Sequence, residues 1–480
     1  SASVALKTIG VEGYSKEVSK EFCGKCVPFF DRVLGDANKA TVHDDATEIL
    51  QILCETKAEF VEAKDVSSLI QTTISKIEDK TYGQTSRKRC AGILASLSRA
   101  ANAKELADVV EKTAARCEKA LAEKDVIGCE LGAFTLGMIA SKDGGGKRLV
   151  AESATGGGGG AKKTKKGGAN GSLASKTVVP VLSKLCTTLV EKMENNEEAD
   201  EAFASIAEQS LMALETICGR FGEVTSKSAK EKQLEEILQM AVKLLTYDPN
   251  YDDDEEEEDD VPADEMETCQ IRTPDHTMKD ADDECEDDDD DDDDDAYDED
   301  YYSDEIEDDD SWKVRRASAR VVGVILCSAS EGILQRHHEV VFKKFFKRMK
   351  SDREDAVKLE CFDALTAAFA AFPKTCDSGL TRALVEKARD LAIVRAQQEC
   401  ALEKAKKTSQ SAIAAATKRK IASLKLLGKI GRANRRLAFV EASEISRSRL
   451  ADAIAGAAVT TFTDSGASSE KDSSANLRLE

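Results

Sequence analysis

Cys23 and Cys26 have the C-x-x-C spacing of a redox dithiol or of half a zinc site, in the stretch CGKC. A redox pair of this type normally lies within a βαβ unit, and no such pattern surrounds the stretch. A structural zinc site needs four ligands, and the nearest histidine, His43, has no companion. We therefore predict that these two cysteines fall on a helix by coincidence.

His337 and His338 are the one adjacent histidine pair of the chain. Neighbouring residues of a helix point about 100° apart, so the two rings cannot easily face one ion. The run GGGGG at 156–160 lacks the Gly-Lys-Ser/Thr ending of a phosphate-binding loop. No serine, histidine and aspartate pattern of a hydrolase accompanies them. We therefore predict a protein that is not an enzyme and that uses no cofactor or metal.

The net charge of the chain comes from one segment. Residues 252–310 hold 36 acidic side chains and only two basic ones, Arg272 and Lys279, a net charge of −34. The other 421 residues hold 66 basic and 55 acidic side chains, a net charge of +11. A mildly basic protein thus carries an acidic insert, and the overall charge alone says little about its partners.

The rest of the chain has a helical composition, rich in Ala, Leu, Lys and Glu, with 5% aromatic residues and six prolines. Its 14 cysteines mostly fall on apolar stripes, which is typical of reduced, intracellular proteins. No apolar run approaches the 18 residues of a membrane-spanning helix. We therefore expect neither a membrane partner nor specific nucleic-acid recognition.

Apolar residues recur at helical spacing in successive segments of about 15–20 residues with short connections. We predict helices over 44–61, 65–79, 86–101, 103–121, 176–194, 199–222, 228–247, 311–326 and 352–365. Val314 and Val357 begin similar helices 43 residues apart, which is the period of HEAT repeats. Stacked helix pairs bury apolar faces that one pair cannot bury alone. The sequence thus predicts an all-α HEAT-repeat superhelical solenoid.

Two segments interrupt the repeats. Residues 143–175 are glycine-rich and basic, and residues 252–310 repel themselves too strongly to compact, so we predict a flexible loop and a disordered acidic insert. HEAT repeats are then expected over 1–142, 176–251 and 311–460, with a polar tail over 461–480. Ser311 is the expected N-cap of the helix that follows the insert. The chain begins at Ser1 within the pattern, as a piece of a longer protein would.

The sequence on both sides of the insert resembles that of one protein family. LLTYDPNYDDDEEEED (244–259) and DDDSWKVRRASA (308–319) flank the acidic run, and ATEILQILCETKAEFV, RKR and VVPVLSKLC precede them in the family's order. The chain resembles the cullin-associated and neddylation-dissociated proteins over roughly residues 1–372. It departs from them in its glycine-rich loop and its longer insert, and it lacks their N-terminal repeats and C-terminal half.

The resemblance implies a HEAT-repeat scaffold of the cytoplasm and nucleus, whose partners are a cullin and its RING subunit. A protein of this family binds unmodified cullin–RING ubiquitin ligases, hinders neddylation and promotes the exchange of substrate receptors in SCF complex assembly. The alternative is a HEAT-repeat nuclear transport receptor with an acidic loop. An acidic histone chaperone is a further alternative.

Trp312, Arg315 and Arg316 are the candidate partner-binding residues, beside the insert. A single tryptophan is a typical interface hot spot, although it also serves as a core anchor between repeats. Arg315 and Arg316 could bind an acidic surface, or they could bridge to the neighbouring repeat. The insert itself could be a solubilising segment, a lure for basic protein surfaces, or a mask for the positive charge of the repeats.

Overall fold

The computed structural model describes residues 16–36, 41–141, 172–195, 201–221, 227–248, 310–328, 331–371, 379–404 and 410–433, with the single positions 149, 448 and 451. The helices below all belong to one unit, residues 1–247 and 310–480, and residues 248–309 form a second. Most of the predicted loop (143–175), almost all of the predicted insert (252–310) and the predicted tail (461–480) lie outside the described residues.

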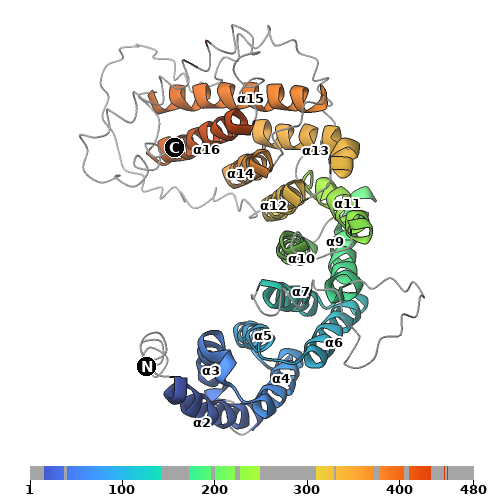
Figure 1. Ribbon diagram of the computed structural model, residues 1–480, viewed down its shortest axis with the longest axis vertical. Helices are drawn as coiled ribbons and strands as arrows, with labels where there is room; N and C mark the ends of the chain where they lie inside the picture. Colours follow the sequence, from blue (N-terminus) through green and yellow to red (C-terminus); the bar gives the residue numbers. More distant parts are fainter. Residues whose placement is uncertain are drawn as a thin grey trace, which may run out of the picture. The chain divides into compact units, whose positions relative to one another are not determined.

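The helices form two rows (Figure 1). Row A contains α2 (Lys16–Gly35), α4 (Ala63–Glu78), α6 (Ala103–Ala122), α9 (Val179–Glu194), α11 (Lys227–Leu244), α13 (Glu331–Ser351) and α15 (Gly379–Lys404). Row B contains α3 (His43–Lys57), α5 (Gln84–Leu97), α7 (Val126–Ser141), α10 (Glu201–Phe221), α12 (Ser311–Ser328), α14 (Asp355–Ala371) and α16 (Gln410–Ala433). A 3₁₀ turn, η2 (Ala58–Phe60), follows α3, and a π-helical turn, η3 (Ala174–Val178), leads into α9.

Each row A helix pairs with the row B helix that follows it, from α2 with α3 to α15 with α16. Each row B helix also contacts the next one in its row, so that the pairs stack. The described residues therefore contain seven helix pairs and form the all-α HEAT-repeat solenoid that the sequence predicts. Each pair depends on its neighbours for burial of its apolar faces.

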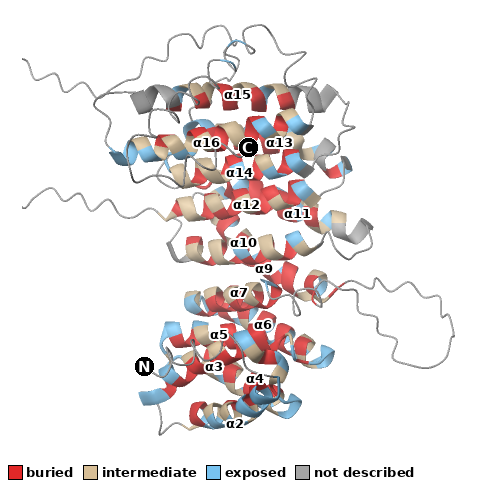
Figure 2. Cartoon of the chain, turned by 60° about the vertical axis from the view of Figure 1, so that its left-hand side comes forward, coloured by how far each residue is buried: buried red, intermediate tan, exposed pale blue. Residues whose placement is uncertain are grey.

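Helix α6 illustrates how local sequence sets an element. Asn102 caps its N-terminus: its side-chain oxygen accepts a hydrogen bond from the Glu105 amide at 2.9 Å, and the Glu105 carboxylate accepts one from the Asn102 amide at 2.9 Å. This reciprocal capping box satisfies two amides that the helix itself leaves free. Leu106, Val110 and Cys117 then follow at helical spacing and are buried. Figure 2 shows the same division in other helices, with buried positions on the sides that face neighbouring helices.

Small residues let the row B helices approach closely. A Cβ atom at Gly323 of α12 would lie 2.7 Å from the Cβ atom of Ala364 in α14. At Gly137 of α7 it would lie 3.1 Å from the Cβ atom of Ala213 in α10. The first distance is shorter than any normal carbon–carbon contact, so only glycine fits there at this helix separation.

The predicted helices are confirmed, with ends that differ by a few residues; the segment predicted over 86–101, for example, is α5 (Gln84–Leu97). Val314 and Val357, which revealed the 43-residue period, are both fully buried in the adjacent helices α12 and α14. Helix α12 begins at Ser311 as predicted, but Ser311 is its first residue and not the cap before it.

We expect Gly323→Ala to lower the free energy of unfolding by about 1–3 kcal/mol, because the added methyl overpacks the contact with Ala364. Gly428→Ala in α16 is the matched control, since no atom lies within 4 Å of its added Cβ. It should stabilise the protein by about 0.5–1 kcal/mol through helix propensity. Urea unfolding of both variants measures the difference, and equal effects at the two positions would contradict the close packing of α12 on α14.

Candidate protein-binding surface

Arg315 lies in the first turn and a half of α12 and is buried, with 1% of its surface exposed. Its Nε donates to Asp352 Oδ2 at 3.0 Å, and its Nη1 donates to the Tyr247 carbonyl at 2.9 Å and to Ser311 Oγ at 2.7 Å. Tyr247 and Ser311 stand on the two sides of the acidic segment in the sequence. One guanidinium therefore ties together the chain on both sides of that segment.

Asp352 and Arg348 complete the contacts around Arg315. Asp352 is buried in the turn before α14, and its Oδ1 accepts a hydrogen bond from the Glu354 amide at 2.9 Å. Arg348 lies 3.5 Å from Asp352 Oδ2 and donates from its Nε to the Leu245 carbonyl at 2.9 Å. The contacts of Arg315, Arg348 and Asp352 link the end of α11 to α12, α13 and α14. A buried ion pair of this kind needs such additional hydrogen bonds to offset its desolvation.

Helix pair α4–α5 has the same arrangement without an insertion. Arg87, in the first turn of α5, donates from its Nε to the Ile77 carbonyl of α4 at 2.9 Å. The donor and acceptor residues are 10 positions apart there, whereas Arg315 and Tyr247 are 68 positions apart. In both pairs, an arginine at the start of the row B helix thus binds a backbone carbonyl at the end of its row A partner. The number of residues that connect the two helices does not change this contact.

The three predicted partner-binding residues have different environments. Arg315 is enclosed within the chain and is not part of the surface; its contacts match the alternative interpretation, a bridge to the neighbouring repeat. Trp312 is half-buried against the core, with the Lys313 ammonium 5.9 Å from the centre of its ring. Arg316 has a side chain that is 40% exposed, and its Nε lies 3.4 Å from Glu360 Oε2. A partner-binding role for Trp312 and Arg316 remains a prediction.

Row B carries, beside Arg316, further charged residues that the sequence analysis did not single out. Arg316 and Arg320, one turn apart on α12, both bind the same carboxylate oxygen of Glu360 on α14; the Arg320 bond is 2.7 Å long. Asp363 lies one turn beyond Glu360 on the same helix, and burial raises the pKa of its carboxyl, with the Glu360 charge adding to the effect. The adjoining surfaces of α12 and α14 thus carry charges of both signs.

Glu208, Met212 and Glu215 extend this surface onto α10, at a spacing that places them on one face of the helix. Met212 is 42% exposed. Burial raises the pKa of the Glu208 and Glu215 carboxyls. The nearby cations of α12, Lys313 and Arg316 at Glu208 and Arg320 and Arg316 at Glu215, only partly counteract it. Within the described part of the chain, neither glutamate forms a hydrogen bond or an ion pair. These two carboxylates, Met212 and the α12 arginines form the candidate protein-binding surface.

Cysteine and histidine chemistry is not supported at the two motifs. Cys23 is buried, and its burial raises the pKa of the thiol, which lowers its reactivity at neutral pH. His337 Nε2 lies 2.6 Å from Glu235 Oε1, so this ring is part of an ion-pair cluster between α11 and α13. Among the described residues, no group of three or more His, Cys, Asp or Glu side chains is placed to hold a metal ion.

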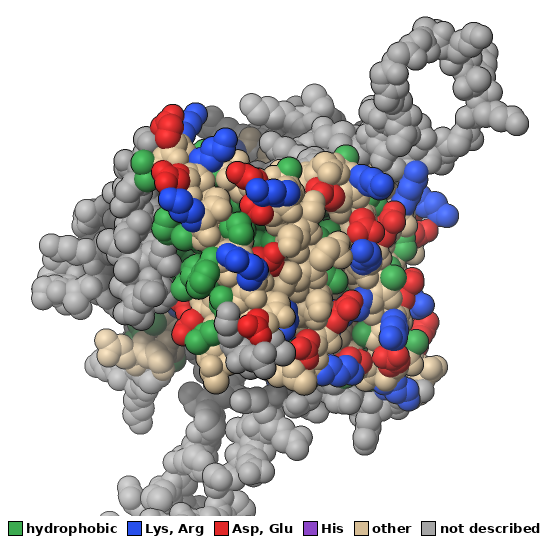
Figure 3. Space-filling view, turned by 90° about the horizontal axis from the view of Figure 1, so that it is seen from below, with side chains coloured by type: hydrophobic (Ala, Val, Ile, Leu, Met, Phe, Trp, Pro, Cys, Tyr) green, Lys and Arg blue, Asp and Glu red, His purple; other side chains and the backbone are tan. Residues whose placement is uncertain are grey.

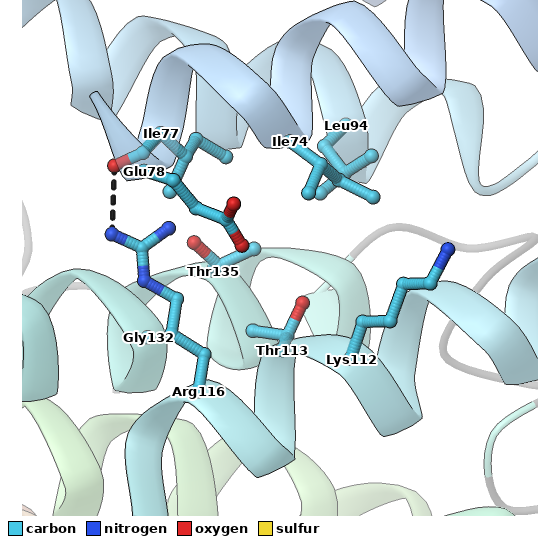
Figure 4. A pocket seen from close by; sticks show the side chains of 9 residues that line it. All are labelled: Ile74, Ile77, Glu78, Leu94, Lys112, Thr113, Arg116, Gly132 and Thr135. Atoms are coloured by element: carbon cyan, nitrogen blue, oxygen red, sulfur yellow. Dashed lines mark hydrogen bonds between the residues drawn. The ribbon is translucent and has the colours of Figure 1, made fainter. Parts of the chain in front are cut away.

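A cavity between α4, α5, α6 and α7 has a volume of about 20 Å³ (Figure 4). Ile74, Leu94, Thr113 and Thr135 line it, and beside them Arg116 donates to the Ile77 carbonyl at 2.7 Å. This volume holds about one water molecule, whereas small-molecule sites usually measure about 300–1,000 Å³. The cavity is therefore too small for a substrate or cofactor. No helix among the described residues is long and apolar enough to span a membrane.

Comparisons with known proteins give no family. No family model matches the chain, and no curated protein matches it. Solved structures similar to the chain include two crystal structures of Kap121p mutants. One is 13% identical with a TM-score of 0.43 and covers 86% of this chain, and the other is 12% identical with a TM-score of 0.43 and covers 94%. The chain spans only 30% and 36% of the lengths of these two structures.

We expect Arg315→Ala to lower the free energy of unfolding by about 3 kcal/mol or more, because it leaves Asp352 buried beside a single, more distant cation. Arg316→Ala, at the neighbouring position, removes a partly exposed ion pair and should cost at most about 1 kcal/mol. Chemical denaturation of both variants provides the comparison. Similar losses for the two would show that the Arg315 contacts do not hold the repeat together.

We expect Glu208→Gln and Glu215→Gln to raise the melting temperature at pH 7. A carboxyl whose pKa is raised by folding destabilises the folded protein once it ionises, so stability falls as pH rises above about 4.5. The gain from each substitution should therefore shrink as the pH is lowered towards 4.5.

Glu235→Gln is the control of opposite sign. Hydrogen bonds from Arg336 and His337 lower the pKa of Glu235 to about 2. Its stabilising contribution is present above about pH 4.5 and is lost as the pH falls towards 2. This variant should thus lower the melting temperature at pH 7, and a gain at pH 7 would contradict the ion-pair geometry.

Proposed function

We propose that this protein is a non-enzymatic binding scaffold that associates with unmodified cullin–RING ubiquitin ligases. A helical-repeat array of this type offers an extended surface for protein binding. The observation that carries the finer proposal is the coincidence of two independent features. Four residues lie in the sequence that resembles the cullin-associated family and also take part in the hydrogen bonds that join α11, α12 and α13 beside the acidic segment. They are Leu245, Tyr247, Ser311 and Arg315.

The proposed mechanism is differential binding. The row B surface around Arg316, Glu208 and Met212 would hold the cullin and its RING subunit, and in doing so would hinder conjugation of the modifier. Release of substrate receptors would follow from mutual destabilisation in a ternary complex, since a coupling free energy acts equally on both ligands. The protein would act in the cytoplasm and nucleus, where these ligases assemble.

The acidic segment would mainly accelerate association. A segment with a net charge of −34 raises the encounter rate with a basic protein surface at low ionic strength. At physiological salt, charges are screened beyond about 8 Å. Affinity would then depend on buried contacts such as Trp312 and Met212 more than on the segment.

The test is a binding titration against an unmodified cullin–RING pair and against the same pair carrying the conjugated modifier. We expect binding of the unmodified pair to be tighter by about tenfold or more, equivalent to about 1.4 kcal/mol, because the modifier obstructs part of the surface. A variant lacking residues 255–308, measured at two salt concentrations, should differ from the full chain mainly in its association rate at low salt. Equal affinity for the two cullin forms would exclude the mechanism.

Absence of binding to either form would be resolved by a second titration, against the small GTPase that regulates nuclear transport. Binding of the GTPase would reject the scaffold proposal in favour of a transport receptor. A variant combining Trp312→Ala and Arg316→Ala tests the predicted contact residues in the cullin titration. Unchanged affinity for that variant would move the interface away from the start of α12.

A further inference from the structure

Helix α10 has one open side. It contacts α7 and α12 in row B and α9 in row A, so neighbouring helices cover its other sides. Figure 2 shows α7, α10 and α12 stacked in this order. Along the open side, Glu208 and Glu215 are partly exposed and Met212 between them is 42% exposed, whereas its neighbours Leu211 and Ala213 are buried. Helix α10 therefore presents an apolar side chain between two carboxylates.

Helix α7 borders this open side with apolar groups. Phe134 and Met138, one turn apart on α7, are half-buried and pack against the core. Helices α7 and α10 lie close together at this level, because a Cβ atom at Gly137 would lie 3.1 Å from the Cβ atom of Ala213. Ala213 adjoins Met212 in the sequence, so the Met212 side chain emerges from α10 beside this contact. The apolar part of the surface thus continues from α10 onto α7.

The negative charge of this surface is not neutralised. Neither Glu208 nor Glu215 has a hydrogen-bond or salt-bridge partner among the described residues. Burial raises the pKa of the Glu208 carboxyl, and the charges of Asp310 and of Glu130 on α7 add to the effect. The arginines of α12 beside them are bonded to Glu360 of α14. A cation supplied by a partner would therefore meet carboxylates that have no cation of their own.

The α2 end of the molecule shows a different arrangement of charge. Lys25 lies 2.6 Å from Glu21 on α2, and Lys64 lies 2.9 Å from Glu62 at the start of α4. Figure 3, which views the molecule from this end, shows basic and acidic side chains intermixed. These carboxylates already have a cation, and exposed pairs of this kind contribute little. The open side of α10 is therefore the better place for a basic partner.

The spacing of the two carboxylates indicates the conformation of such a partner. Glu208 and Glu215 are seven positions apart, which corresponds to about 10 Å along the axis of α10. Residues seven positions apart on a partner helix have the same separation, with the third and fourth positions between them on the same side. On one face of an extended strand, side chains repeat at about 7 Å and then 13 Å. A helix therefore matches both carboxylates and Met212 at once.

We propose that this surface docks an amphipathic helix of a partner protein, which carries two lysine or arginine residues seven positions apart and an apolar residue midway between them. The two cations face Glu208 and Glu215, and the apolar residue packs on Met212 beside α7. Methionine suits this place because its flexible side chain adapts to the group it contacts. Helices often dock through anchors at this spacing. The inference rests on the proposed binding function of row B and adds the chemistry of the segment that binds there.

The test is a fluorescence-anisotropy titration of the full chain with a labelled helical peptide that has two lysines seven positions apart and leucines at the third and fourth positions. We expect saturable binding at physiological salt. Glu208→Gln with Glu215→Gln should weaken it by at least about tenfold, because both cations lose their partners. The variant lacking residues 255–308 should show the same loss, because the acidic segment is not the binding site.

A matched control is available on row A. Glu111 and Glu118 are exposed on α6 at the same seven-residue spacing, so Glu111→Gln with Glu118→Gln makes the same change in charge. This variant should bind the peptide as the unaltered chain does, and an equal loss in both double variants would overturn the proposal. The changes at Glu208 and Glu215 are expected to raise the melting temperature, so a loss of affinity in that variant does not come from unfolding.

Two altered peptides test the geometry. Moving the second lysine two positions further along the peptide places the two cations on opposite sides of the helix. A proline in the middle of the peptide breaks the helix. Both peptides should bind at least about tenfold more weakly, and equal binding of either would overturn the proposal.

The cullin–RING titration separates this inference from the proposed function. Peptide binding that depends on Glu208 and Glu215 supports the inference even if the cullin–RING pair does not bind. Binding of the cullin–RING pair, combined with no peptide binding, would reject the inference and leave the proposed function in place.

Discussion

The Arg315 guanidinium is the interaction on which the second half of the array depends. A helix pair packs only if the end of its first helix and the start of its second are held together, and Arg315 does this for α11 and α12 from inside the core. Because the contact is made by a side chain and not by a short turn, the number of residues between the helices hardly matters. Closing a longer loop costs only about 0.6 kcal/mol for each doubling of its length. The array therefore tolerates an acidic insertion inside a repeat.

The ion pair with Asp352 extends this constraint to the next repeat. Asp352 is buried at the start of α14, so the guanidinium that closes one helix pair also fixes its neighbour. Glycine at position 323 brings α12 and α14 close together along their length. Close approach of the helices in turn allows Arg316 and Arg320 to reach Glu360 across the gap. The distance between α12 and α14 thus determines both the buried and the surface ion pairs at this junction.

The charges on row B acquire their properties from the same packing. Glu208 and Glu215 lie between neighbouring helices that remove water from around them, yet the α12 arginines are directed to Glu360. Their carboxylates are therefore less stable ionised than they would be in water. A partner that brings a cation to this surface would gain more there than at a fully solvated glutamate. This property suits a surface that binds basic protein groups.

The sequence predicts helix α6 but not helix α7, and the two differ in how far apolar residues surround them. Helix α6 has a capping box and a clear periodic stripe, so its place in the fold follows from local chemistry. Helix α7 contacts α5, α6 and α10 and is apolar almost all round, which removes the 3.6-residue period on which the prediction depends. The sequence analysis therefore contains no helix over 126–141, although most of its residues are buried.

The sequence by itself determined the all-α repeat class and the 43-residue period, because these depend on periodicity along the chain. It also identified Arg315 and Arg316 as residues of interest. Only the tertiary structure decided that Arg315 is buried and joins neighbouring helices, whereas Arg316 lies at the surface. Adjacent positions on a helix point about 100° apart, so packing alone selects which one is enclosed. The partners of Glu360 were decided in the same way, by which helices lie next to each other.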